Sequence, residues 1–146
     1  MKLSEHFTLA EMTKTSYNIK NVPNEAQVEN LKRLCSWLEM LRSEWNRRYG
    51  EGNDPIIINS GFRSEAVNNV IGGTATSNHL SGCAADIRVA GMEQLIRYAT
   101  ILLDISDESK EDFDELLLEY SHKGSYWLHF AVRPNGNRRK VRLIQA

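Results

Sequence analysis

The most regular pattern in the chain is an apolar stripe over residues 25–49. Apolar side chains recur there at spacings of three and four residues, as on one face of an α-helix. The stripe consists of Val28, Leu31, Leu34, Cys35, Leu38, Leu41 and Trp45. Asn24 and Gln27 form a capping-box pattern before it, and Gly50 is placed to end the helix. We therefore predict a long helix that buries one face.

Three other segments also have helical patterns. Thr8 is followed three residues later by Glu11, which predicts a short helix with a capping box. Residues 65–71 follow Ser64, a residue type favoured at the N-cap, and precede a glycine pair. Residues 92–104 carry apolar side chains at helical spacing. These segments predict three further helices.

Short apolar runs predict β-strands between and after these helices. Residues 55–59 and 84–89 are rich in β-branched or small apolar side chains, as in buried strands. Residues 114–120 and 126–132 predict a hairpin, and residues 140–144 predict an edge strand. We therefore expect an α+β fold with a small antiparallel sheet and helices packed on it.

Composition and length limit the number of domains and the kinds of partner. At 146 residues the chain has the size of one domain, and no repeat or linker divides it, so we expect a single compact domain over residues 1–146. The formal net charge of −1 favours neither nucleic acid nor a membrane surface as a partner. The segment from Arg133 onward is locally basic; we favour a solvated terminal strand over a surface for a polyanion.

The sequence shows no sign of a membrane or secretory segment. No run approaches the roughly 20 apolar residues of a membrane span, and no signal-peptide pattern follows Met1. Two cysteines, Cys35 and Cys83, are too few for a disulfide framework. We expect a monomeric protein that is synthesised in the cytoplasm.

His79, Asp86 and His129 are the candidates for chemistry. Asp86 lies in an expected buried strand, where an unpaired carboxylate would cost several kcal/mol. Zinc binds imidazole nitrogen and carboxylate oxygen, and three protein ligands leave a position for water, as in catalytic sites. The spacing alone leaves a second interpretation open, in which His79 contacts a loop carbonyl while Asp86 pairs with Arg63 or Arg88.

Three motifs resemble one known family. Residues 77–86, SNHLSGCAAD, match all five fixed positions of the S-x-H-x-x-G-x-A-x-D signature of the zinc D-Ala-D-Ala carboxypeptidase family. The segment SGFRS at residues 60–64 resembles its SGYRS element, and residues 127–129 resemble its W-x-H element. The resemblance covers almost the whole chain and is greatest to compact single-domain members from phages and bacterial genomes. It implies a hedgehog/DD-peptidase-like fold.

The resemblance also implies roles for individual residues. His79, Asp86 and His129 would be the zinc ligands. Arg63 would stabilise a developing oxyanion or bind a substrate carboxylate, for which a planar, permanently charged group is suited. Ser77 would bind a substrate carboxylate or, equally well, form a local hydrogen bond to the backbone.

The general base is the point at which this sequence departs from the family pattern. Some members have a Glu three residues before the last ligand, where this chain has Tyr126. A three-residue loop over residues 123–125 would instead place Glu119 opposite His129, on the same face of the hairpin. We therefore predict Glu119 as the base, with His122 in the loop as the reserve candidate.

The resemblance implies zinc-dependent hydrolysis of peptide bonds in peptidoglycan stem peptides, of the D-Ala-D-Ala carboxypeptidase type. Its alternatives are an L-Ala-D-Glu endopeptidase (endolysin), a non-catalytic zinc- or cell-wall-binding module, and a structural component of a phage particle. Without a signal peptide, the protein would reach the cell wall by phage-type release or by another route of export.

Overall fold

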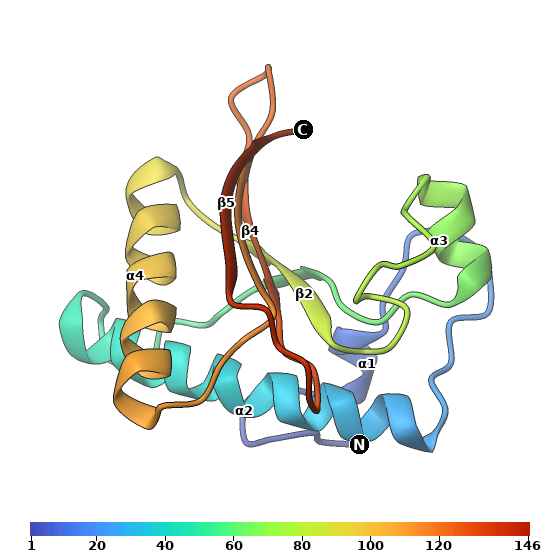
Figure 1. Cartoon of the computed structure of the whole chain (residues 1–146), viewed down its shortest axis with the longest axis horizontal. Coiled ribbons are helices and arrows are strands. Elements are labelled where there is room, and N and C mark those ends of the chain that lie inside the picture. Colours follow the sequence, from blue (N-terminus) through green and yellow to red (C-terminus); the bar gives the residue numbers. More distant parts are fainter.

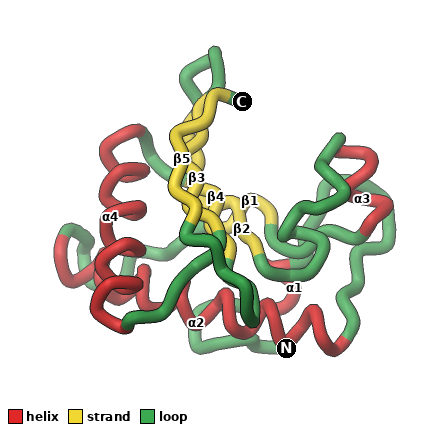
Figure 2. Tube along the Cα trace, viewed as in Figure 1, coloured by secondary structure: helices red, strands yellow, loops and turns green.

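A five-stranded mixed sheet forms the centre of the molecule in the computed structural model, which describes residues 1–146. Figures 1 and 2 show the sheet between α4 on one side and α3 on the other, with α2 running below it. The strands are β1 (Ile58–Ser60), β2 (Ala84–Arg88), β3 (Glu115–Tyr120), β4 (Tyr126–Ala131) and β5 (Lys140–Gln145). Their order across the sheet is β1-β2-β4-β3-β5.

The expected α+β fold is confirmed, but one pair of strands departs from the expected antiparallel sheet. β5 pairs with β3 in parallel, whereas the other neighbours are antiparallel. The reason lies in the turn after β4, which brings the chain back to the starting end of β3. There Arg139 and Lys140 donate backbone hydrogen bonds to the carbonyl groups of Phe113 and Asp114. β4 already lies between β2 and β3, so β5 takes the free edge beside β3.

The helices agree with their predicted caps. They are α1 (Leu9–Met12), α2 (Glu25–Arg48), α3 (Glu65–Ile71) and α4 (Met92–Ser109). Thr8 with Glu11 and Asn24 with Gln27 form complete capping boxes, and Gly72 ends α3 in the left-handed conformation. α4 continues beyond the predicted residue 104 as far as Ser109. No helix is long and apolar enough to cross a bilayer.

The main core lies where α2 and α4 pack on the sheet. The stripe of α2 is buried there, and Trp37 of this helix contacts the rings of Phe113 and Phe130. Cys35 and Cys83 are buried and unbridged. Because these helices cover one face of the sheet, the polar side chains of β2, β3 and β4 gather on the other.

The β3–β4 hairpin has a different register from the one predicted. Tyr120 pairs with Tyr126, and Ser121 donates its backbone N–H to the carbonyl of Ser125. The loop therefore begins one residue earlier than expected, and His129 lies opposite Leu117 rather than Glu119. The partner of His129 thus differs from the predicted one by two residues along β3. Side chains alternate between faces with a period of two, so Glu119 is still on the face of His129.

Candidate metal centre

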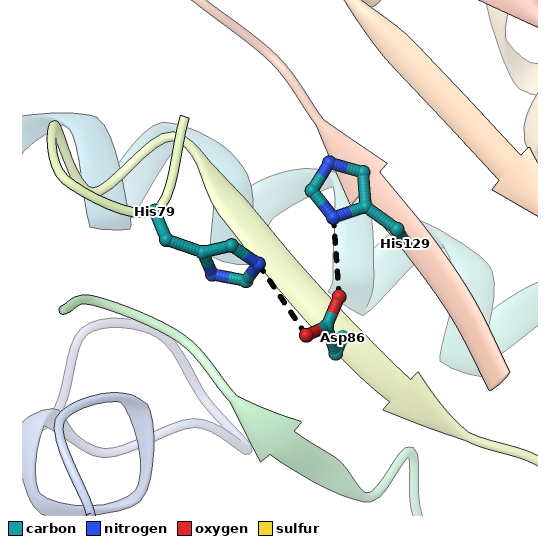
Figure 3. A group of neighbouring side chains, drawn as sticks. All are labelled: His79, Asp86 and His129. Atoms are coloured by element: carbon teal, nitrogen blue, oxygen red, sulfur yellow. Dashed lines mark hydrogen bonds and ion pairs between the residues drawn. The ribbon is translucent and has the colours of Figure 1, made fainter. Parts of the chain in front are cut away.

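Three side chains converge on one face of the sheet, at the middle of the strands β2 and β4. Asp86 and His129 are direct partners across the two strands, and His79 reaches them from the loop between α3 and β2. Figure 3 shows both rings directed at the Asp86 carboxylate. His129 Nδ1 lies 3.1 Å from Asp86 Oδ1, and His79 Nε2 lies 3.4 Å from Asp86 Oδ2. One donor atom from each residue lies within 4.8 Å of the other two.

His79 is oriented for binding a cation. Its Nδ1 lies 2.7 Å from the carbonyl oxygen of Gly61, which can only accept, so Nδ1 carries the hydrogen. The other nitrogen, Nε2, is buried and has no hydrogen-bond partner. Buried polar atoms are normally satisfied, so an exception of this kind calls for an explanation. A metal ion between Nε2, Asp86 and His129 supplies one.

His129 has a supporting contact on its far side. Its Nε2 lies 3.0 Å from Glu115 Oε1, while Nδ1 faces Asp86. Metal-binding histidines commonly donate their second ring N–H to a carboxylate or a carbonyl, which fixes the ring. Glu115 therefore supports the ring of His129 in the same way as the carbonyl of Gly61 supports the ring of His79. Two imidazoles supported in this way, together with the Asp86 carboxylate, fit a zinc site.

The charges of the centre depend strongly on one another. Burial raises the pKa of Asp86, but the contacts with His129 and His79 outweigh it and leave this pKa well below its usual range. Burial lowers the pKa of His129, while Asp86 and Glu115 raise it to about 9. The hydrogen bond with His129 lowers the pKa of Glu115. A cation bound to His129 Nδ1 would displace a proton from it.

A cavity of about 530 Å³ opens beside these residues. Glu119 lines it, and the indole N–H of Trp127 donates to Glu119 Oε2 over 2.8 Å. Burial raises the pKa of Glu119, and the nearby Asp86 carboxylate adds to the effect. Glu119 is thus a half-buried carboxylate on the face of the metal ligands, with one oxygen held by Trp127.

Arg63 and Ser77 line the same cavity. Arg63 donates from Nη2 to Asp86 Oδ2 over 3.1 Å and from Nε to Ser60 Oγ over 3.1 Å. Its pairing with Asp86 is the alternative contact considered from the sequence. The hydroxyl of Ser77 accepts the backbone N–H of His79 over 3.2 Å, which is the local hydrogen bond expected as the alternative to substrate binding by Ser77.

His122 does not join this group. It is exposed in the β3–β4 loop, where the side-chain amide of Gln145 contacts its ring, and it does not line the cavity. Cys83 is buried directly before β2 and is not among the side chains that converge on Asp86. The structure thus brings together every predicted site residue except His122.

Sequence reasoning missed several residues of the cavity. Glu115 is one of them, although the alternation of β3 places it on the same face as Glu119. Arg133, Arg138 and Lys140 also line the cavity. The basic composition of this segment was visible in the sequence, but the pairing of β5 that brings it to the cavity was not.

Residues 5–107 match the family model described as peptidase M15. The chain belongs to the peptidase M15 family. This confirms the family resemblance and the expected class of the protein, a metallopeptidase. The matched part of this M15 protein includes Arg63, Ser77, His79 and Asp86, whereas His129 and Glu119 lie beyond it.

One curated relative of this M15 protein is a zinc D-Ala-D-Ala carboxypeptidase of Streptomyces albus G. The two sequences are 45% identical over 40 residues. That stretch covers 27% of this chain and 16% of the relative, so this M15 protein corresponds to only a small part of the relative's length.

Proposed function

We propose that the chain is a zinc-dependent peptidase that cleaves amide bonds in peptidoglycan stem peptides, of the D-Ala-D-Ala carboxypeptidase type. The observation that carries the proposal is the buried, unpartnered Nε2 of His79, which faces Asp86 and His129 beside an open cavity. The name of the Streptomyces relative supports both the metal and the substrate class.

His79, Asp86 and His129 would hold the zinc ion through Nε2, the carboxylate and Nδ1. When bound, zinc acts as a Lewis acid on a carbonyl group and lowers the pKa of water to about 7. The chain's own residues then have two tasks: to move the proton of the attacking water and to neutralise the negative charge that develops on the carbonyl oxygen.

Glu119 is our candidate for the proton transfer. It would accept a proton from the attacking water and deliver it to the amine that leaves. Its raised pKa suits this role, because a carboxylate with a pKa nearer to neutral is a stronger base towards the attacking water. Trp127 holds one carboxylate oxygen and leaves the other for water. We prefer Glu119 to His122, since only Glu119 lines the cavity.

Arg63 is our candidate for charge stabilisation. Its guanidinium group uses Nε for Ser60 and one Nη2 hydrogen for Asp86, which leaves further N–H groups of the planar fork. These groups would donate to the carbonyl oxygen of the scissile bond as negative charge develops on it. Ser77, at the rim of the same cavity, would bind the peptide through its hydroxyl group.

The test combines metal analysis with digestion of purified peptidoglycan. We expect about one zinc per chain and chelator-sensitive release of D-Ala. New amino termini without free D-Ala would instead identify an endopeptidase, including one that cleaves L-Ala-D-Glu. Zinc without any cleavage would indicate a binding module or a structural role. Purified protein that binds no zinc would refute the proposal.

A further inference from the structure

The cavity has a basic wall at one end, formed by Arg133, Arg138 and Lys140. All three side chains line the same cavity as the proposed zinc ligands. Lys140 begins β5, and the two arginines come from the turn between β4 and β5. None of them has a task in the proton transfer or charge stabilisation described above, so the basic wall calls for a separate explanation.

The register of the sheet gives the position of the basic wall relative to the metal centre. Asp86, His129 and Leu117 form one row across three strands. Two residues along the strands, and so on the same face, Ala131, Glu115 and Lys140 form another row. Two residues of a strand span about 7 Å. The basic wall is therefore displaced by two residues along the strands from the metal row, and Arg138 Nη2 lies 3.7 Å from Glu115, the carboxylate that contacts His129.

Buried Asp114 holds the arginines in place. Its fully buried carboxylate accepts from Arg138 Nε over 3.0 Å and from Arg138 Nη2 over 2.8 Å. Arg133 Nε lies 3.2 Å from Asp114 Oδ2 and donates to Asn78 Oδ1 over 2.9 Å. Asn78 immediately precedes His79 in the loop that carries this ligand, so the wall is fixed relative to the metal centre.

The basic wall keeps an excess of positive charge. Asp114 and Glu115 neutralise part of the charge of the two arginines, and Glu115 also contacts His129. Lys140 is half-buried and forms no ion pair. A lysine that lines a cavity without a carboxylate of its own is available to an anionic ligand.

We propose that the basic wall binds a free carboxylate of the peptide substrate, carried within one or two residues of the scissile bond. An extended chain advances 3.3–3.6 Å per residue, so two residues cover the displacement of about 7 Å along the strands between the two rows. Stem peptides offer two such groups: the terminal carboxylate of D-Ala-D-Ala, and the α-carboxylate of D-Glu when its side chain forms the peptide link. The inference rests on the proposed function for the identity of the peptide.

The test uses two peptides, one that ends in D-Ala-D-Ala and one that contains L-Ala-γ-D-Glu. Each is prepared in two forms, with the terminal carboxylate or the D-Glu α-carboxylate, respectively, as the free acid or as an amide. The zinc-loaded protein is compared with Lys140→Met, Lys140→Arg and the control Lys123→Met. The control removes the same charge from the exposed β3–β4 loop, outside the cavity. For the acid of whichever peptide is cleaved, Lys140→Met should raise KM about tenfold, with kcat nearly unchanged.

The matched variants separate a contact from a general effect of charge. Lys140→Arg should return KM most of the way to the value of the unmodified protein. The KM for the amide should be the same in all variants. Selectivity for the acid in only one of the two peptides identifies the carboxylate that is bound. An equal loss for acid and amide, or an equal loss from Lys123→Met, would overturn the inference.

A failure of the proposed function leaves a different result. If no peptide is cleaved, the same four peptides are titrated into the zinc-loaded protein by calorimetry. Tighter binding of an acid than of its amide, lost in Lys140→Met and kept in Lys123→Met, would support the basic wall while refuting the peptidase. Binding without such a preference, or no binding of either form, would overturn the inference as well.

Discussion

Trp127 donates its indole N–H to the carboxylate of Glu119 over 2.8 Å, from the strand position directly opposite. The two residues are cross-strand partners of the β3–β4 hairpin, and their side chains lie on the face that carries His129. The bond fixes one oxygen of the candidate base beside the metal centre. The hydrogen bond from Trp127 therefore fixes the orientation of Glu119 in the cavity.

Replacing Glu119 with Gln should abolish most of the activity and leave the metal in place. The amide cannot accept the proton of the attacking water, and general base catalysis contributes about 10²–10⁴-fold. We expect kcat to fall by that order, with about one zinc per chain retained. Glu111→Gln, in the exposed turn after α4, is the matched control. Full activity in Glu119→Gln would show that another group acts as the base. His122→Gln would then be the next variant to test.

The pH dependence of Trp127→Phe should reveal the same base. Burial raises the pKa of Glu119, while the N–H of Trp127 counteracts it by stabilising the carboxylate. The base works when it is ionised, so activity rises with pH through this pKa. Phenylalanine removes the N–H and raises the pKa further, which should move the acid limb of kcat/KM to higher pH. If the acid limb of kcat/KM is unchanged in Trp127→Phe at equal zinc content, Glu119 is not the catalytic base.

The helices and the signature residues were predictable because their signals are local. A capping box joins positions three apart, as at Asn24 and Gln27, and the apolar stripe of α2 repeats within two turns. The pairing of Asp86 with His129 is different, since it needs two strands 43 positions apart to align. The sequence indicated it only through the family resemblance.

Strand register could not be deduced, because alternation repeats every two residues. Placing the hairpin loop one residue late still predicted the correct face for Glu119, but gave it the wrong partner. The same uncertainty concealed the contact between Glu115 and His129. Lys140 entered the cavity only because β5 pairs in parallel with β3, beside Glu115.

Glu115→Gln should weaken zinc binding without removing the site. Glu115 accepts from His129 Nε2 over 3.0 Å, and loss of its charge makes the imidazole a weaker ligand. Supporting contacts of this kind change metal affinity by about 10–100-fold, and we expect the lower end because the amide oxygen still accepts. Competition with a chromophoric chelator measures the affinity, with Glu119→Gln as the control. Equal affinities in the two variants would show that Glu115 does not support the metal.

Gly82→Ala should destabilise the fold more than Gly72→Ala does. Both glycines have positive φ values, +77° and +83°, so each substitution introduces backbone strain of about 1–3 kcal/mol. A Cβ at Gly82 would also lie 2.6 Å from the carbonyl oxygen of Gln27, whereas a Cβ at Gly72 meets nothing within 4 Å. Chemical denaturation of both variants isolates the contact between the signature loop and α2. Equal losses would mean that the loop shifts to accept the methyl group.

The buried carboxylate behind the basic wall should make the stability of the metal-free protein depend on acid pH. Burial raises the pKa of Asp114, but hydrogen bonds from Arg138 and Asn78 outweigh it and lower the pKa from 3.8 to about 2. A lowered pKa stabilises the fold above the unfolded value, by roughly 2 kcal/mol here, and this contribution disappears as pH falls from about 4 to 2. Asp114→Asn cannot titrate, so its deficit in unfolding free energy relative to the unmodified chain should be full at pH 6 and shrink by that amount towards pH 2. Denaturant titrations of both proteins with chelator present measure this difference. Parallel curves across the range would show that Arg138 and Asp114 do not form the ion pair that holds the wall in place.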